Sequence, residues 1–446
     1  MAPLMENSLA TMFLTLLLSS SWSQTVSATR NRVKSLPGFE GPLPFHLETG
    51  YVGIDERDDV HLFYYFIQSE RNPSEDPVLL WLSGGPRCSS FSGLAYEIGP
   101  LRFKDAEKND YIPTLILHSD SWTKVANIIF LDAPAGSGFS YSKTAQALEV
   151  SDTTYAQGTY IFLIKWLMEH PEFISNQLYV GGDSYSGYIV PIIGYILGNP
   201  CTNRQMERNT YISYAHGMGL ISTELYESLK RTCKGKYVIY DNSSIECSRD
   251  HKAFIECISH INFQHISEPL CYTSPFEEKR RSLATTRKLL SPNSILPENC
   301  RTGGYNLSQY WANNDQVQSA LHVRKGTIKE WIRCNQNGFP YTYDVISSIE
   351  YHQRISTKGY RSLIYSGDHD MEVSHFSTEE WIRMLNSSIV DDWHPWHVDN
   401  QIAGYTRTFS NGMTYTTVKG AGHQAPEYMP KECLAMFTRW LSHNPL

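Results

Sequence analysis

Short apolar runs, each followed by a glycine-containing loop, mark the first half of the sequence. Residues 61–67 and 77–82 have the length of strands, and the second run has the unbroken apolar character of a strand buried on both faces. Further apolar runs at 127–131 and 177–180 flank residues 153–170, which have a helix-forming composition. This alternation predicts an α/β fold, with a mostly parallel central sheet and helices on both faces.

The apolar pattern changes between residues 211 and 309, which are polar, cysteine-rich and helix-leaning. We interpret this segment as a lid-like insertion that separates two parts of the core, 35–210 and 310–446. A final helix is predicted at 430–441. The basic, polar stretch 279–288 inside the insertion predicts an exposed loop that is cleaved in the mature protein.

The first 28 residues have features of a secretory signal peptide. An apolar core at 9–18 precedes small residues at 26–28, but Glu6 stands where a basic charge is usual, so a disordered apolar tail stays an alternative. The mature domain would span residues 29–446 and be extracellular or vacuolar. Nine cysteines and three N-x-S sequons agree with secretion. The expected glycosylation sites are Asn242, Asn306 and Asn386.

The overall charge excludes some function classes. The net charge is −8 and only 19% of residues are charged, which is unlike a nucleic-acid-binding protein. No apolar run approaches the ~18 residues of a transmembrane helix. We therefore expect neither nucleic acid nor, in the mature form, a membrane as a partner.

The stretch from Gly181 to Gly187 combines a preceding apolar run, small residues and a central Ser184. Strand, glycine-tight turn with a serine, and helix is the layout of a nucleophile elbow. The strict pattern has glycine where Ser186 stands, so this is a relaxed version. An ordinary glycine- and serine-rich turn is the alternative.

Two further polar residues follow predicted strands. Asp368 follows the run at 361–365, and His423 follows the run at 413–418. The order Ser184, Asp368, His423 is that of the α/β-hydrolases. The histidine would take the serine proton, and the aspartate would hold the imidazole tautomer and stabilise its cation. Taken singly, Asp368 could be a turn residue and His423 a loop histidine.

With the stretches 81–90, 365–371 and 420–428 added, the sequence from about residue 35 to its end resembles the plant serine carboxypeptidase-like proteins, peptidase family S10. The resemblance implies an α/β-hydrolase fold, the triad above and an oxyanion hole formed by the backbone N–H groups of Gly85 and Tyr185. The stretch 84–86 could also be an ordinary turn. The resemblance implies neither cofactor nor metal. The acids next to His369 could suggest a metal cluster, but neighbouring residues at a strand end point in different directions.

Within this family, two branches differ near the nucleophile. The peptidase branch has asparagine at the place of Ser83 and glutamate at that of Asp183, which bind a peptide carboxylate together with a glutamate matching Glu97. Such acids share a proton, so that activity is expected at acidic pH. Serine and aspartate here resemble the acyltransferase branch, which moves an acyl group from a 1-O-acyl glucose ester to an acceptor alcohol. The expected substrate-binding residues are Ser83, Gly84, Glu97 and Asp183.

Two alternatives to an acyltransferase remain: a carboxypeptidase, or a secreted glycoprotein without catalytic activity. Asp183 could also merely stabilise its turn. The resemblance further suggests three disulfides, although spacing alone fixes no connectivity. These are Cys88–Cys334, Cys233–Cys247 and Cys271–Cys300, which leaves Cys201, Cys257 and Cys433.

Arg87 departs from the family pattern, as does the segment after Ser184, which is considered below. Relatives carry glycine at the place of Arg87, so a positive φ there would cost about 1–2 kcal/mol. The arginine side chain either crowds the active-site cleft or points to solvent, in which case the substitution is tolerated. If it crowds the cleft, Arg87→Gly raises activity or thermal stability.

Only nine residues, 185–193, separate the nucleophile from a predicted parallel strand at 194–198. A crossover normally needs a dozen or more residues. We therefore expect a truncated helix behind Ser184 and a displaced or frayed strand, which could leave an inactive isoform.

Overall fold

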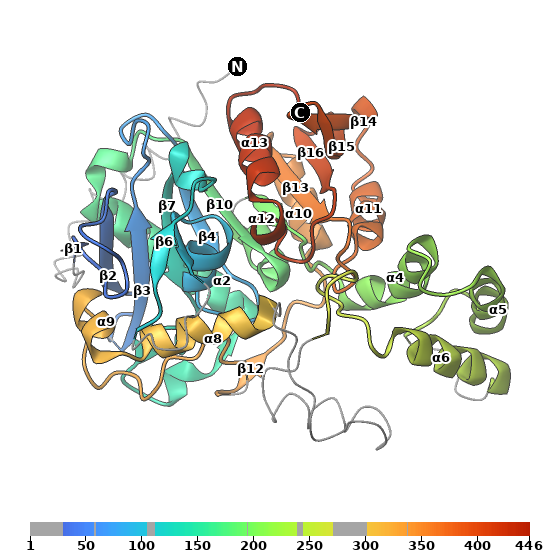
Figure 1. Cartoon of the computed structure of the whole chain (residues 1–446), viewed down its shortest axis with the longest axis horizontal. Helices are drawn as coiled ribbons and strands as arrows, with labels where there is room; N and C mark the ends of the chain where they lie inside the picture. Colours follow the sequence, from blue (N-terminus) through green and yellow to red (C-terminus); the bar gives the residue numbers. More distant parts are fainter. Residues whose placement is uncertain are drawn as a thin grey trace.

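A twelve-stranded sheet runs through the described residues of the computed structural model, which are 30–57, 59–104, 112–193, 195–238, 244–270, 301–336 and 338–446 (Figure 1). The strands follow the order β1-β2-β3-β7-β4-β10-β11-β13-β16-β15-β14, and β8 pairs with β3. Their bounds are Asn31–Val33 (β1), Leu47–Gly53 (β2), Val60–Ile67 (β3), Val78–Leu82 (β4), Asn127–Asp132 (β7), Tyr141–Ser142 (β8), Leu178–Asp183 (β10), Ile196–Gly198 (β11), Ser362–Gly367 (β13), Ile389–Val398 (β14), Gln401–Phe409 (β15) and Met413–Val418 (β16).

Pairing is parallel at the centre of this sheet and antiparallel at both sides. The pairs from β7 through β4, β10, β11 and β13 to β16 are parallel. The outer pairs, β1 to β3 with β7 on one side and β14 to β16 on the other, are antiparallel. The carboxyl ends of the central strands therefore share one edge, where α/β proteins place their sites.

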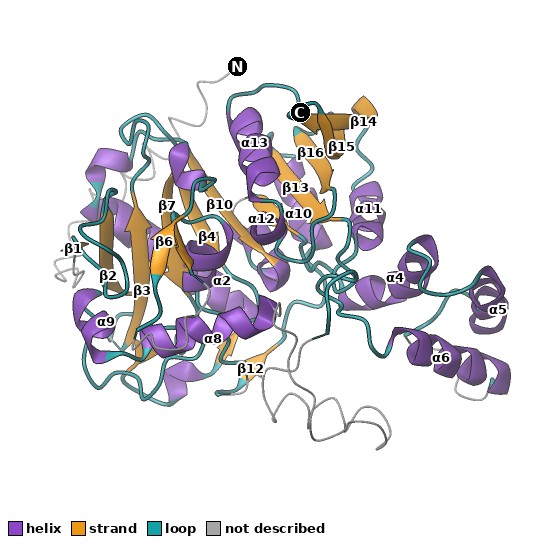
Figure 2. Ribbon diagram, in the orientation of Figure 1, coloured by secondary structure: helices purple, strands orange, loops and turns teal. Residues whose placement is uncertain are grey.

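Helices cover both faces of the sheet (Figure 2). On β4, Leu79 and Trp81 lie in the core on one face, whereas Leu80 and Leu82 lie in the core on the other. This strand is buried on both sides, which explains its unbroken apolar sequence. The first core contains residues of α8 (Arg301–Ala312), α9 (Asp315–Ala320), α12 (Ala425–Tyr428) and α13 (Pro430–Leu441). The second contains residues of α2 (Asp152–Glu169), α10 (Ile349–Ser356) and α11 (His375–Met384). The predicted fold class is confirmed.

Short elements connect these layers. Two small sheets pair β5 with β6 and β9 with β12. Their bounds are Leu101–Phe103 (β5), Leu115–Leu117 (β6), Val150–Ser151 (β9) and Tyr341–Thr342 (β12). The short helical turns are η1 (Gly93–Glu97), η2 (Trp122–Lys124), η3 (Gln146–Leu148), η4 (Pro171–Phe173) and η5 (Ser184–Tyr188).

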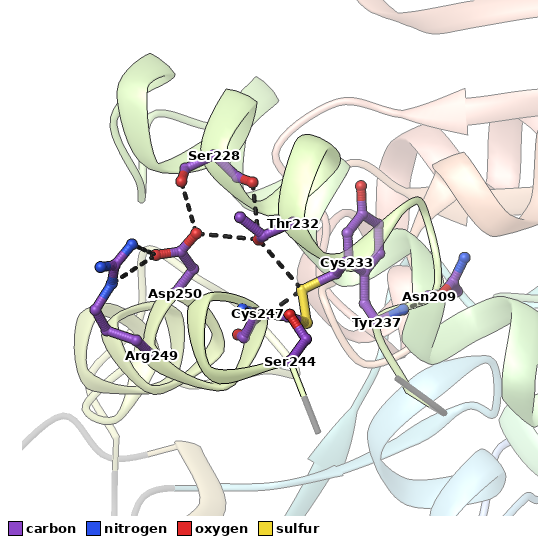
Figure 3. The surroundings of a disulfide bond; sticks show 9 residues. All are labelled: Asn209, Ser228, Thr232, Cys233, Tyr237, Ser244, Cys247, Arg249 and Asp250. Carbon is purple, nitrogen blue, oxygen red and sulfur yellow. Dashed lines mark hydrogen bonds and ion pairs between the residues drawn. A yellow bond between two sulfur atoms is a disulfide. The ribbon is translucent and has the colours of Figure 1, made fainter. Parts of the chain in front are cut away.

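Three helices, α4, α5 and α6, project from one side of the sheet (Figure 1). Their bounds are Arg204–Gly217, Thr223–Cys233 and Ile245–Ile258. The predicted disulfide Cys233–Cys247 joins α5 to α6 (Figure 3). Beside it, Asp250 of α6 accepts hydrogen bonds from Ser228 (2.6 Å) and Thr232 (3.1 Å) of α5. One covalent bond and one buried carboxylate thus hold the two helices together.

The connection after the nucleophile strand is short, as the sequence indicates. The helix α3 spans only Val190–Ile193, so the predicted truncation is confirmed. The expectation of a displaced strand is wrong, because β11 pairs in parallel with both β10 and β13. The strand is nevertheless shorter than the predicted 194–198, since it begins at Ile196. The register explains this: Ile196 lies opposite Gly181, so β11 meets only the last three residues of β10. The chain need therefore run back only ~10 Å, rather than the full length of a strand.

Some predictions fall on residues outside the described ranges. These are the signal peptide, the predicted cleavage at 279–288, the first residue of the predicted strand 194–198, the pair Cys271–Cys300 and the sequon at Asn242. The sequon asparagines Asn306 and Asn386 are both exposed. In the described part of the chain, no helix combines the length and apolar character needed to cross a membrane.

Candidate active site

Ser184, His423 and Asp370 form a hydrogen-bonded chain at the carboxyl edge of the sheet. The Ser184 Oγ lies 2.8 Å from the His423 Nε2, and the His423 Nδ1 lies 2.7 Å from the Asp370 Oδ2. A carboxylate can only accept, so Nδ1 carries a proton, and in the neutral imidazole Nε2 is left to accept from the serine hydroxyl. This is the geometry of a serine nucleophile, a base and an orienting acid. The predicted Ser184 and His423 are brought together.

The prediction that Asp368 is the acid of the triad is wrong. Its Oδ1 accepts a hydrogen bond from the backbone N–H of Gly420 (2.6 Å). It therefore braces the loop before His423, whereas Asp370 lies two residues further on and is fully buried against the histidine. Burial raises the pKa of Asp368. Both acids follow β13, so their distance from the strand end did not distinguish them.

The turn at Ser184 has the strained backbone of a nucleophile elbow. Its φ is 53°, in the left-handed region that non-glycine residues adopt rarely. Ser186 stands where the strict pattern has glycine, and its hydroxyl donates to the carbonyl of Asp183 at 2.5 Å. The hydroxyl therefore adds one hydrogen bond within the turn, and the small serine side chain is accommodated where the strict pattern has glycine.

The loop after β4 lies directly against this elbow. A Cβ on Gly84 would come within 2.6 Å of the Ser184 Cβ and 2.9 Å of the Tyr185 backbone nitrogen. Gly85 has a φ of 117°, which only glycine adopts readily. Asp132 at the end of β7 anchors the loop, since it accepts from the Ser89 hydroxyl (2.6 Å) and the Ser90 N–H (2.9 Å). Burial raises the pKa of Asp132 to about 7.

The charge of the acid changes the basicity of His423. Burial lowers the pKa of His423, but the charge and hydrogen bond of Asp370 outweigh burial and raise it to about 9. The carboxylates of Glu372 and Asp183 act in the same direction. The site therefore stabilises the imidazolium that forms when the histidine accepts the serine proton.

Three predicted binding residues are buried beside the nucleophile. Ser83, Glu97 and Asp183 are each 4% exposed. Burial and then the charge of Asp183 raise the pKa of Glu97 well above its usual range. Among the described residues, neither Ser83 Oγ nor Glu97 Oε2 has a hydrogen-bond partner. Two buried polar atoms near the nucleophile turn are thus without a hydrogen-bond partner in this part of the structure.

The segment after α6, which sequence reasoning did not assign to the site, supports the acid and the base. The N–H of His423 donates to the carbonyl of Gln264 (2.8 Å), and those of Met371 and Glu372 donate to the carbonyl of Phe263 (2.8 and 3.0 Å). Backbone contacts of this kind leave no sequence signal. The two catalytic loops are therefore held by the same piece of the insertion.

Arg87 has the predicted positive φ, 66°, but its side chain does not point to solvent. It is fully buried, and its Nη2 donates to the carbonyls of Leu148 (2.7 Å) and Pro340 (2.9 Å). Its guanidinium also lies over the rings of Phe339 and Tyr341. The arginine thus joins the loop after Gly85 to two other segments.

The predicted disulfide Cys88–Cys334 is confirmed and ties the same loop to the C-terminal half of the chain. Cys201, Cys257 and Cys433 are free. In the part of the chain that the structure describes, no group of three or more His, Cys, Asp or Glu side chains could hold a metal ion.

Comparison with known proteins agrees with this fold. A sequence model of the serine carboxypeptidase family matches residues 37–443. Two Arabidopsis thaliana proteins, serine carboxypeptidase-like 13 and serine carboxypeptidase-like 19, are each 51% identical, with 93% of this chain and 94% of theirs aligned. The prohormone-processing carboxypeptidase Kex1(delta)p of Saccharomyces cerevisiae superposes with a TM-score of 0.69 at 18% identity, covering 92% of this chain and 95% of its own. The chain belongs to the serine carboxypeptidase family.

Proposed function

We propose that this enzyme of the serine hydrolase type is an acyltransferase, which moves an acyl group from a 1-O-acyl glucose ester to an acceptor alcohol. Ser184 Oγ attacks the ester carbonyl while His423 takes its proton, and the glucose oxygen leaves with that proton. His423 then takes a proton from the acceptor alcohol, whose oxygen attacks the acyl-serine. The bond between the acyl carbon and Ser184 Oγ breaks, His423 gives that proton to the leaving serine oxygen, and a new ester and free Ser184 result.

The arrangement of Asp183 is the observation that carries the choice of a transferase. Its Oδ1 accepts from the N–H of Gly84 (3.1 Å), and its Oδ2 lies 3.5 Å from the Gln424 amide nitrogen. The carboxylate therefore braces the loop against the elbow. Ser83 offers a hydroxyl where a peptidase of this family has an amide donor. A substrate carboxylate would find few donors here, which disfavours peptide C-termini.

The backbone N–H groups of Gly85 and Tyr185 are the proposed oxyanion hole. The tight approach of Gly84 to Ser184 supports this role, because it brings the loop within reach of the nucleophile. Tyr185 lies in the first turn of η5, where a helix leaves N–H groups without intrahelical partners. Two donors aimed at the developing oxyanion would lower the barrier to acyl transfer.

A carboxypeptidase stays the second candidate, and the pair Glu97 and Asp183 favours it. Burial raises the pKa of both carboxyls, so each tends to keep a proton at mildly acidic pH. A protonated carboxyl can donate to a peptide carboxylate. This binding mode would be lost as pH rises and the shared proton leaves. An inactive protein is disfavoured, because the three triad side chains are within hydrogen-bond distance.

The test compares two reactions with one preparation. The purified glycosylated protein is incubated with an acyl glucose and an acceptor alcohol, and separately with a blocked dipeptide. We expect ester formation with the first pair, faster toward about pH 9, and little cleavage of the dipeptide at any pH from about 4 to 9. The double variant Ser83→Asn with Asp183→Glu should move the balance toward dipeptide cleavage. Faster dipeptide cleavage by the unaltered enzyme would overturn the proposal.

We further propose a secreted or vacuolar location with glycans at Asn306 and Asn386. Both side chains are exposed, as a glycan acceptor requires. Digestion of the native protein with an N-glycosidase should lower its mass, and an unchanged mass would contradict this proposal.

A further inference from the structure

The side chain of Asn199 contacts the catalytic acid from behind. Asn199 directly follows β11, the strand at the end of the shortened connection, and is fully buried. Its Nδ2 donates to the Asp370 Oδ2 at 2.7 Å. This is the same carboxylate oxygen that accepts the proton of His423 Nδ1 at 2.7 Å. One oxygen of Asp370 therefore serves both the base and Asn199.

The other atoms around Asn199 fix the orientation of its amide. Its Oδ1 accepts from the N–H of Gly367 at 3.1 Å, and a backbone N–H can only donate. A carboxylate can only accept, so the amide nitrogen must face Asp370. The backbone N–H of Asn199 also donates to the carbonyl of Tyr365 at 2.8 Å. The residue is thus held at three points along the end of β13.

Asp370 has no freedom to turn within these contacts. Its second oxygen, Oδ1, accepts from the N–H groups of Glu372 (2.8 Å) and Val373 (3.3 Å). The carboxylate plane is set on one side by this turn and on the other by Asn199. With only the turn in place, Oδ2 would have no second partner to hold it toward His423.

The backbone at Asn199 also restricts which residue can stand there. Its φ is 42°, in the left-handed region, where asparagine is tolerated better than most residues. Glycine would keep this backbone but lose both side-chain bonds. Aspartate would keep the shape but set a second negative charge against Asp370. Asparagine satisfies the backbone and both partners together.

We propose that Asn199 is a positioning residue of the triad, which holds Asp370 Oδ2 in line with His423 and so sets the reactivity of Ser184. This gives the short β11 a function: it delivers Asn199 to the acid across a connection that has lost most of its helix. The proposal depends on the triad and not on which acyl donor or acceptor the enzyme uses.

The test measures the rate at which a fluorophosphonate probe labels Ser184, which needs no knowledge of the substrate. Asn199→Gly should label ~10–100-fold more slowly than the unaltered enzyme, the usual loss when an outer partner of a reactive group is removed. Asn400→Gly is the matched control, because Asn400 has a φ of 60°, is exposed and lies at the turn between β14 and β15. Its labelling rate should stay unchanged.

A second variant separates positioning from general destabilisation. In Asn199→Asp, the introduced carboxyl repels Asp370 when ionised but can donate a hydrogen bond to its Oδ2 when protonated. The labelling rate relative to the unaltered enzyme at the same pH should therefore rise as the pH falls from about 9 to about 5. The corresponding ratio for Asn199→Gly should stay flat.

Either of two results would overturn the proposal. One is labelling of Asn199→Gly within about twofold of the unaltered enzyme. The other is a ratio for Asn199→Asp that does not change with pH. If Asn199→Gly does not give a cooperative thermal transition, the pH dependence of Asn199→Asp decides alone.

Discussion

The nucleophile turn after β10 and the acid turn after β13 lie at the same edge of the sheet but are specified in different ways. At the first, Ser184 is set by its own backbone, with a φ of 53° and a glycine loop packed against it. At the second, two aspartates stand two residues apart, and distant groups select between them. Asp368 meets Gly420, whereas Asp370 meets His423 and Asn199. Local strain can be read from a sequence, but a choice made by remote partners cannot.

The largest effect should come from the nucleophile turn, where two serines stand two residues apart. Ser184→Ala should lower turnover by at least ~10³-fold, and toward ~10⁶-fold if the triad acts as a unit. Ser186→Ala is the matched control and should cost less than ~10-fold, because its hydroxyl only donates to a carbonyl within the turn. Steady-state assays of both variants check this. Equal losses of turnover in the two variants would show that the structure of the turn, rather than the Ser184 hydroxyl, determines the rate.

The acid turn should give the next largest effect. Asp370→Asn should lower kcat by ~10⁴-fold, since an amide no longer holds the required imidazole tautomer. Asp368→Asn should lower it by less than ~10-fold, because it keeps an oxygen that can accept from Gly420. The two variants have the same chemistry two residues apart. The reverse ranking would restore Asp368 as the catalytic acid.

The pH dependence of the reaction sharpens the same contrast. Asp370 raises the pKa of His423 to about 9, and only the neutral imidazole can take the serine proton. The kcat/KM value should therefore be low at a pH where His423 is protonated. It should rise as the pH increases through the range in which the imidazole loses its proton. Asp370→Asn removes the charge, so the acid limb should move to lower pH. Asp368→Asn should leave the limb in place, and a shift in that variant would contradict the assignment.

Arg87 gives the smallest effect and concerns stability. Its left-handed backbone costs ~1–2 kcal/mol, but hydrogen bonds to charged groups contribute ~1.5–3 kcal/mol each. Two other guanidinium atoms, Nε and Nη1, are buried without a hydrogen-bond partner among the described residues, and burial lowers the pKa of the guanidinium, so part of that gain is offset. We expect the two bonds and the contacts with Phe339 and Tyr341 to outweigh these costs and to reverse the sign of the sequence-based expectation. Arg87→Gly should lower the melting temperature, and Arg87→Ala should lower it further, since alanine loses the bonds and keeps the strain. A higher melting temperature for Arg87→Gly would restore the original expectation.

The regular parts of the fold follow from local sequence. The predicted strand at 413–418 coincides with β16, and the predicted helix at 430–441 coincides with α13. Each has an apolar pattern whose period matches its structure, and each ends at polar or glycine residues. The predicted α/β class rests on the same patterns.

The errors arose where pairing decides the outcome. The strand after Ser184 was expected to need a full crossover, but its register against β10 shortens the path. The sequence does not favour Asp370 over Asp368, because only the positions of His423 and Asn199 select Asp370. Register and side-chain partnership depend on residues far apart in the chain, and a single sequence carries no direct signal for either.

The central claim is that an acyl-enzyme forms on Ser184, and mass spectrometry of the trapped intermediate tests it most directly. The enzyme is mixed with an acyl glucose without acceptor, quenched in acid within the first turnovers and digested. We predict that the peptide containing Ser184 gains the mass of the acyl group, and that it gains none in Ser184→Ala. Turnover without any acylated peptide, or acylation of a different residue, would contradict the account.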